Sequence, residues 1–151
     1  MGFLDADSAT DPAEGCRLAQ ELFSNGKVEV VLGSRLKCLG YRVERSLKRH
    51  LSGRIFATLV SNFFDIPIYD SQCGAKFFRR KTIDQNLLEA CTNNGWLFDL
   101  ELVLQLWKRK VSIKEMPVNW IDQDGSKISL VRDSVKMFWQ LWKMKKTMSF
   151  L

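Results

Sequence analysis

Two carboxylates near the beginning of the sequence have the spacing of a cation site. Asp5 and Asp7 flank one small residue and follow the apolar pair Phe3-Leu4. Side chains two residues apart in a strand point to the same side, so at a strand end both carboxylates can face one cation. Mg²⁺ and Mn²⁺ favour carboxylates combined with diphosphate oxygens and water. Taken alone, the pair is more often a solvated turn or a helix cap, because Asp is common at helix N-termini.

Basic residues are concentrated in two segments of a chain whose formal net charge is +6. Residues 35–54 carry seven Lys or Arg against Glu44, and residues 126–151 carry six against Asp133. The remainder of the chain is acidic. This distribution predicts anionic partners at defined places, and phosphate groups and anionic lipid both fit. No nucleic-acid partner is expected.

Arginines of the first basic segment, residues 35–54, are candidates for binding phosphate. A strand that ends at Gly33-Ser34-Arg35 can deliver a guanidinium to a pocket. Arg42, Arg45 and Arg49 lie nearly opposite an apolar i, i+4 stripe on a helix expected over residues 42–63. A solvated helix face and a phosphate-binding face both remain open. Three arginines with one acid nearby repel each other, which suggests a phosphate partner.

Further polar residues occur in two segments later in the chain. Residues 70–80 contain Gly74 in the middle of a possible strand, so a loop or a close backbone approach is expected there. Asp99 and Glu101 begin a helix, where residues two apart do not share a face. Glu101 could therefore point into a site while Asp99 caps the helix or binds elsewhere. The alternative is plain acidic charge at a helix N-terminus, which the helix dipole favours.

The remaining pattern predicts an alternation of helices and strands. Expected are helices over 12–24, 82–92 and 99 to about 109, a strand over 28–32, an edge strand pair over 111–120 interrupted at Pro117, a turn over 122–127, and a helix over 129–146. In the last helix, Trp139 and Trp142 lie beside lysines. That composition suits a membrane interface, although a terminal helix packed on its own domain is the other possibility.

Composition is typical of one soluble domain in a reducing compartment. The chain has 151 residues, of which 46% are hydrophobic. Its four cysteines include no C-x-x-C pair and it has one histidine, so we expect reduced, mostly buried thiols in the cytosol. No apolar run approaches the roughly 18–20 residues that span a bilayer.

Five ordered motifs together resemble the family 2 glycosyltransferases, in particular those that act on dolichyl or polyprenyl phosphate. They are Asp5-Ala-Asp7, Gly33-Ser-Arg35, the stretch from Asp70 to Arg79, Gly95 to Glu101, and Pro117 to Trp120 followed by Gly125-Ser-Lys127. The resemblance runs from residue 2 to about residue 145. It implies an α/β fold, namely the C-terminal part of a GT-A (nucleotide-diphospho-sugar transferase) fold with an incomplete mixed sheet in residues 1–128, followed by an amphipathic helix in residues 129–151.

The resemblance also implies roles for individual residues. Asp5 and Asp7 match the site of Mg²⁺ or Mn²⁺ and the donor diphosphate. Arg35 and Arg49 match basic residues near the lipid phosphate or the diphosphate. Two sets match the surroundings of the reacting sugar: the loop residues Asp70, Gln72, Cys73 and Gly74, and the helix-start residues Asp99 and Glu101. Ser126 and Lys127 match a mobile loop over the phosphates.

The implied reaction moves a hexose, expected to be glucose, from a nucleotide-sugar donor to a polyprenyl or dolichyl phosphate acceptor. It is a metal-assisted inverting displacement at the cytosolic face of a membrane with an anionic surface. The family places a nucleotide-binding half before the Asp-Ala-Asp motif, so the chain is expected to be incomplete. The alternatives are a non-catalytic module that binds anionic lipid or phosphate, and a related transferase with a saccharide acceptor.

Overall fold

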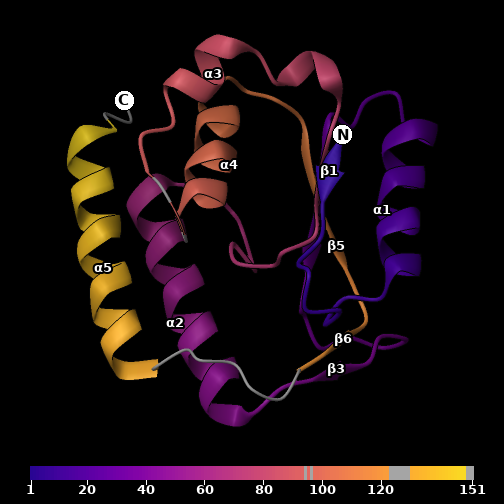
Figure 1. Cartoon of the computed structure of the whole chain (residues 1–151), viewed down its shortest axis with the longest axis horizontal. Helices are drawn as coiled ribbons and strands as arrows, with labels where there is room; N and C mark the ends of the chain where they lie inside the picture. The colour runs from indigo at the N-terminus through magenta and orange to yellow at the C-terminus, as the bar shows by residue number, and fades with distance from the viewer. Residues whose placement is uncertain (94, 96, 123–129, 149–151) are drawn as a thin grey trace.

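A four-stranded mixed sheet forms the centre of the chain, and helices cover both of its faces (Figure 1). The computed structural model describes residues 1–93, 95, 97–122 and 130–148, and of residues 130–135 the backbone. The strand order is β1 (Gly2–Phe3), β4 (Lys76–Phe78), β2 (Val30–Ser34) and β5 (Ile113–Pro117). β4 is antiparallel to both neighbours, whereas β2 and β5 are parallel. The predicted α/β class with a mixed sheet is confirmed, and the GT-A assignment stays a prediction.

Strand β2 is buried along its whole length and divides the core into two halves. Val30 and Leu32 join the larger apolar cluster, which includes side chains of α2 (Leu47–Phe64), α4 (Phe98–Lys108) and α5 (Leu130–Thr147). Val31 points to the opposite face and joins the cluster beneath α1 (Pro12–Ser24). This alternation is the period of two that a strand buried on both faces requires.

Helix α1 begins and ends where the sequence predicts. The side chain of Asp11 accepts a hydrogen bond from the backbone N–H of Ala13, and Pro12 occupies the first turn, where its missing N–H costs nothing. Leu18 and Leu22 are buried against the sheet, whereas Phe23 is 82% exposed. The helix thus covers one face of the sheet by itself (Figure 1).

The helix expected over residues 42–63 begins later, at Leu47, because Ser46 caps it. Residues 43–44 instead form β3 (Val43–Glu44), which pairs in parallel with β6 (Trp120–Ile121). The expected buried stripe is therefore wrong in its first half: among its members, Leu47, Leu51 and Ile55 are exposed. Burial is confined to the later turns, at Ala57, Val60 and Phe64.

Around Gly74 the expectation of a loop or a close backbone approach is confirmed, since Gly74 lies in a bend before β4 and a β-carbon there would collide with the carboxylate of Asp5. Strand β4 itself, which lies inside the sheet between β1 and β2, was not predicted. Two other expectations need correction. The first long strand runs over Val30–Ser34 rather than 28–32. The helix expected over 82–92 is replaced by a 3-10 turn, η1 (Arg80–Thr82), and a short helix, α3 (Gln85–Glu89). The edge position of the 111–120 segment is confirmed, since β5 is the last strand of the sheet.

Helix α5 packs on the protein through one face and exposes aromatic rings on another. Leu141, Met144 and Met148 are buried in the larger cluster, whereas Trp139 is 60% exposed and Trp142 40%. The two tryptophan rings are arranged edge to face, with their centroids 5.6 Å apart. A boundary at residue 129 stays a prediction. In the part of the chain that the structure describes, no helix combines the length and apolarity that a bilayer crossing needs.

The cysteines are free, as predicted, but they are not mostly buried. Cys16 and Cys38 are exposed, Cys91 is half-buried, and Cys73 alone is fully buried. Burial raises the pKa of both Cys73 and Cys91 to about 11.

Candidate functional site

The Asp5-Ala6-Asp7 turn leaves β1 and lies against the segment that enters β4. A β-carbon at position 74 would collide with the carboxylate of Asp5, so only Gly74 permits this approach. The carboxylate of Asp7 accepts a hydrogen bond from the N–H of Ala9 at 3.0 Å. Loss of hydration, and then the charge of Asp7, raise the pKa of Asp5. Two sequence motifs that are nearly 70 residues apart thus meet at one place.

This turn has the chemistry of a cation site that is completed by its ligand. Repulsion between Asp5 and Asp7 is the kind of energy that a bound cation removes. Among the described residues, no three or more His, Cys, Asp or Glu side chains gather closely enough to hold a metal. A Mg²⁺ or Mn²⁺ ion on these two carboxylates would therefore take its other ligands from diphosphate oxygens and water, as Mg²⁺ usually does. Metal binding stays a prediction.

Arg35 and Asp70 form a half-buried, bidentate ion pair. The Nε and Nη2 atoms of Arg35 donate to the carboxylate of Asp70 at 2.6 and 2.7 Å, and the Arg35 backbone N–H donates at 2.9 Å. Burial alone would raise the pKa of Asp70, but the charge and hydrogen bonds of Arg35 outweigh it and lower that pKa. The guanidinium also lies over the ring of Trp120, 5.5 Å from its centroid. Arg35 is thus fixed at the end of β2, as the Gly-Ser-Arg motif predicts.

Glu115 of β5 holds the segment that carries Asp70. Its two carboxylate oxygens accept hydrogen bonds from the backbone N–H groups of Tyr69 and Asp70, at 2.9 and 2.7 Å. Gln72 donates its backbone N–H to Asp70 at 3.2 Å, while its side-chain nitrogen is buried without a partner among the described residues. An unpaired buried donor is costly unless a ligand satisfies it.

Asp99 pairs with a lysine that is completely buried. The Nζ atom of Lys76 donates to the carboxylate of Asp99 at 2.6 Å and to the carbonyl of Cys73 at 2.5 Å. Lys76 has no solvent exposure, and the side chain of Asp99 is 23% exposed. The charge of Lys76 also acts on Asp5. The pair therefore links the start of α4 to the turn that carries the acidic motif.

Glu101 has a different environment from Asp99. Its buried carboxylate accepts hydrogen bonds from the backbone and side-chain N–H groups of Asn93, both at 2.8 Å. These contacts hold the segment before α4. The structure therefore places Asp99, but not Glu101, beside the acidic turn, and a catalytic role for either residue stays a prediction.

The arginines before and within α2 have unequal partners. Arg49 forms an ion pair with Asp122, and Arg42 pairs with Glu44. The expectation that these arginines have one acid nearby is therefore wrong, because the fold brings Asp122 to Arg49. Arg45 differs from both, since no ion pair or hydrogen bond to its guanidinium occurs within the described ranges. The predicted loop residues Ser126 and Lys127 lie outside the described residues.

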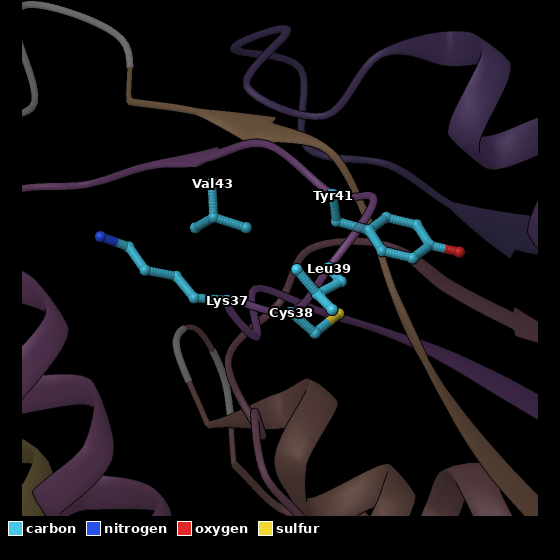
Figure 2. A pocket seen from close by; sticks show the side chains of 5 residues that line it. All are labelled: Lys37, Cys38, Leu39, Tyr41 and Val43. Atoms are coloured by element: carbon cyan, nitrogen blue, oxygen red, sulfur yellow. The ribbon is translucent and has the colours of Figure 1, made fainter.

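A shallow surface hollow lies on the loop between β2 and β3. Figure 2 shows the side chains of Lys37 and Val43 turned toward one another, whereas the ring of Tyr41 extends away from them. Leu39 at its rim is fully exposed. None of the predicted site residues lines this hollow, and it carries no obvious chemistry.

Sequence reasoning missed three residues that organise the site: Lys76, Glu115 and Asp122. Lys76 had a visible signal, because a lysine beside Ala75 and Phe77-Phe78 is unusual in an apolar run. Glu115 lies within a strand, where an isolated carboxylate is also unusual and could have marked a site residue. Asp122 offered no such signal, since its partner Arg49 is 73 residues away.

Comparison with known proteins gives relatives over most of the chain. A dolichyl-phosphate beta-glucosyltransferase of Saccharomyces cerevisiae is 31% identical over 137 residues, which are 89% of this chain and 41% of the yeast protein. One of Dictyostelium discoideum is 30% identical over 138 residues, 89% of this chain and 42% of that protein. Glycosyltransferase AglD of Haloferax volcanii is 31% identical over 147 residues, 92% of this chain and 23% of AglD.

These relatives confirm the resemblance to the family 2 glycosyltransferases that act on dolichyl phosphate. The chain spans about two fifths of the length of the two dolichyl-phosphate beta-glucosyltransferases. No protein-family model and no solved structure matches it.

Proposed function

We propose, from its kinship with the family 2 glycosyltransferases, that this chain holds the phosphate groups in a GT-A enzyme that transfers glucose from a nucleotide diphosphate sugar to dolichyl or polyprenyl phosphate. The observation that carries the proposal is the meeting of three of the family motifs around residues 70–76. Asp5 contacts Gly74, Arg35 is paired with Asp70, and Asp99 is paired with Lys76.

The proposed reaction is a single displacement at the anomeric carbon. An oxygen of the acceptor phosphate forms the new bond to that carbon, while the bond to the nucleoside diphosphate breaks, and the configuration inverts. The acceptor phosphate is already an anion at neutral pH, so it needs little help from a general base. The protein must instead orient the phosphate and neutralise charge. Arg35 and Arg49 have this task, with Asp70 and Asp122 fixing their orientation.

Asp5 and Asp7 would hold Mg²⁺ or Mn²⁺ together with the donor diphosphate. When bound, such an ion stabilises the negative charge that develops on the leaving diphosphate. Lys76 holds Asp99 in place beside these carboxylates. Gly74 leaves room for Asp5 and thereby sets the distance between the acidic turn and the segment that begins at Asp70.

We further propose that α5 lies on an anionic membrane surface on the cytosolic side, where the acceptor lipid resides. Exposed Trp139 and Trp142 have the amphipathic rings that favour the headgroup level. Lys143 and Lys146 lie close to them in the sequence, and the Nζ atom of Lys146 lies 3.6 Å from the centroid of the Trp142 ring. Each basic residue near anionic lipid adds on the order of 1 kcal/mol to membrane binding.

A transfer assay tests the reaction. The chain would be joined to the nucleotide-binding half that the resemblance places before Asp5, and supplied with radiolabelled UDP-glucose or GDP-glucose and Mg²⁺. Glucose should pass to dolichyl phosphate and not to dolichol, which lacks the phosphate. Transfer to a saccharide acceptor at an equal or higher rate would favour the alternative transferase, and no transfer to any acceptor would favour a non-catalytic module.

A further inference from the structure

We propose that Arg45 is a further anion-binding residue, which binds a phosphate group of the substrate together with Arg35 and Arg49. These three residues, with Asp70 and Asp122, are called the arginine-rich region below. The inference rests on the proposed function for the identity of the phosphate, but not for the existence of the anion site.

The side chain of Arg45 is held in place by packing. Arg45 lies just before the cap of α2, and its guanidinium folds back over the helix onto Gly53. A β-carbon at position 53 would lie 2.6 Å from Nη2 and 3.1 Å from Nη1 of Arg45. Glycine inside a helix costs about 1 kcal/mol relative to alanine. Gly53 therefore has a clear structural use, which is to make room for this guanidinium.

This fixed guanidinium has no counter-charge of its own. Its Nε atom is buried without a hydrogen-bond partner among the described residues. The two carboxylates that act on it, Asp70 and Asp122, are already paired with Arg35 and Arg49. Burial, and then the charge of Arg35, lower the pKa of Arg45 despite these carboxylates. Three guanidinium groups thus share two carboxylates.

A phosphate group fits this imbalance. Buried charges are normally paired, and an unpaired buried donor carries a desolvation cost that a ligand can remove. Guanidinium groups match phosphate oxygens through planar, paired N–H donors. The phosphate could come from the acceptor lipid or from the donor diphosphate, because both present the same oxygens.

Isothermal titration of the 151-residue chain distinguishes the two sources. Farnesyl phosphate, with farnesol as its uncharged counterpart, represents the acceptor, and inorganic pyrophosphate represents the donor. Arg45→Gln should weaken binding of at least one phosphate probe about tenfold, as expected for the loss of a charge-assisted contact. Arg80→Gln removes an exposed arginine outside the site and should change affinity less than about twofold.

Gly53→Ala provides an independent test that leaves Arg45 in place. The new methyl group should displace the guanidinium and weaken phosphate binding, while the urea midpoint rises because alanine favours the helix. In the Arg45→Gln background, Gly53→Ala should have no further effect on binding. A stabilising effect combined with weaker binding would not follow from general damage to the fold.

The outcomes separate this inference from the proposed function. If Arg45→Gln and Gly53→Ala weaken pyrophosphate binding alone, Arg45 binds an anion, and that anion is the diphosphate of the donor. If they weaken farnesyl phosphate binding, Arg45 contacts the acceptor. If the parent chain binds neither probe, or if both variants bind as the parent does, the inference is wrong whatever the transfer assay shows.

Discussion

Two charged regions share the segment from Asp70 to Lys76, and their charge balances are opposite. In the acidic region, the charges of Asp7, Asp99 and one buried cation, Lys76, act on the carboxylate of Asp5, and Lys76 is paired with Asp99. In the arginine-rich region, three guanidinium groups face two carboxylates. Both regions are only partly neutralised by the protein itself. The first therefore favours a cation and the second an anion.

Under the proposed function, this difference would divide the charges of a displacement reaction between the two ends of one short segment. The leaving diphosphate needs positive charge near it, which the acidic region can supply only through a bound metal ion. In the proposed reaction the substrate phosphates would also need fixed donors, which the arginine-rich region would supply directly. Asp70 and Lys76 are six residues apart, so a change in this segment affects both regions.

The largest effect is expected from Lys76→Met. The substitution keeps the apolar length of the side chain but leaves the carboxylate of Asp99 and the carbonyl of Cys73 without their donor. Removing one partner of a buried pair typically costs 3–5 kcal/mol. Because Asp99 is partly exposed, we expect a loss of about 2–4 kcal/mol in the free energy of unfolding, measured by urea denaturation.

Lys81→Met is the matched control, because Lys81 pairs with Glu29 at the surface. Such pairs contribute about 1 kcal/mol or less. Equal losses for the two variants would mean that the acidic region is not built around Lys76.

Asp7→Asn should act on the reaction rather than on folding. In a protein that joins this chain to the nucleotide-binding half, we expect a fall of about 100-fold in kcat/KM, which corresponds to about 2.7 kcal/mol. Asp11→Asn is the control, since asparagine caps a helix as well as aspartate does. Activity of Asp7→Asn within about threefold of the parent would remove the metal role and leave the acidic region without a ligand.

A smaller effect is expected at the membrane surface that is proposed to bind α5. Lys136→Glu/Lys143→Glu/Lys146→Glu avoids Lys145, which donates to the carbonyl of Phe63. Co-sedimentation with vesicles containing phosphatidylserine should fall at least about tenfold at low salt and less at moderate salt. Lys27→Glu/Arg80→Glu/Lys81→Glu makes the same charge change elsewhere. Equal binding by both variants would show that α5 is only a packing element.

The smallest effect should follow modification of the exposed thiols. At pH 7.5, methyl methanethiosulfonate should add to Cys16 and Cys38 but not to Cys73 or Cys91, because a pKa of about 11 leaves these thiols protonated. Mass spectrometry would count two adducts. Phosphate affinity should change less than about twofold, since the hollow beside Cys38 lies outside both regions. A larger change would extend the arginine-rich region to the loop between β2 and β3.

Local signals in the sequence were sufficient for elements whose ends are set by neighbouring residues. Helix α1 followed from Asp11, Pro12 and its apolar spacing, and α4 and α5 followed from periodicity. By contrast, the stripe from Leu47 to Ile55 has the spacing of a buried face yet is exposed. An i, i+4 pattern identifies an apolar face but does not show whether another element covers it.

Site residues were predictable where neighbouring residues in the sequence indicate the role. They were not predictable where the role depends on a partner that is distant in the sequence. Arg35 stands at a strand end, as its motif indicated. Strand β4 was missed because Gly74 interrupts the run before it, and Lys76 within the run has no evident partner in the sequence. Both are explained only by distant residues, since Asp5 requires the glycine and Asp99 satisfies Lys76. The position of the Arg45 guanidinium is likewise explained only by a distant residue, because Gly53 leaves room for it.

The parallel register of β2 and β5 has a consequence for how the chain folds. Val30 pairs with Ile113, about 80 residues later, so the central strand gains its second neighbour only when most of the chain has been synthesised. Closing so long a loop costs entropy before any contact repays it, and domains with such distant pairings fold in milliseconds to seconds rather than microseconds. Until then, one edge of β2 stays open to other chains, so refolding yield should fall as protein concentration rises.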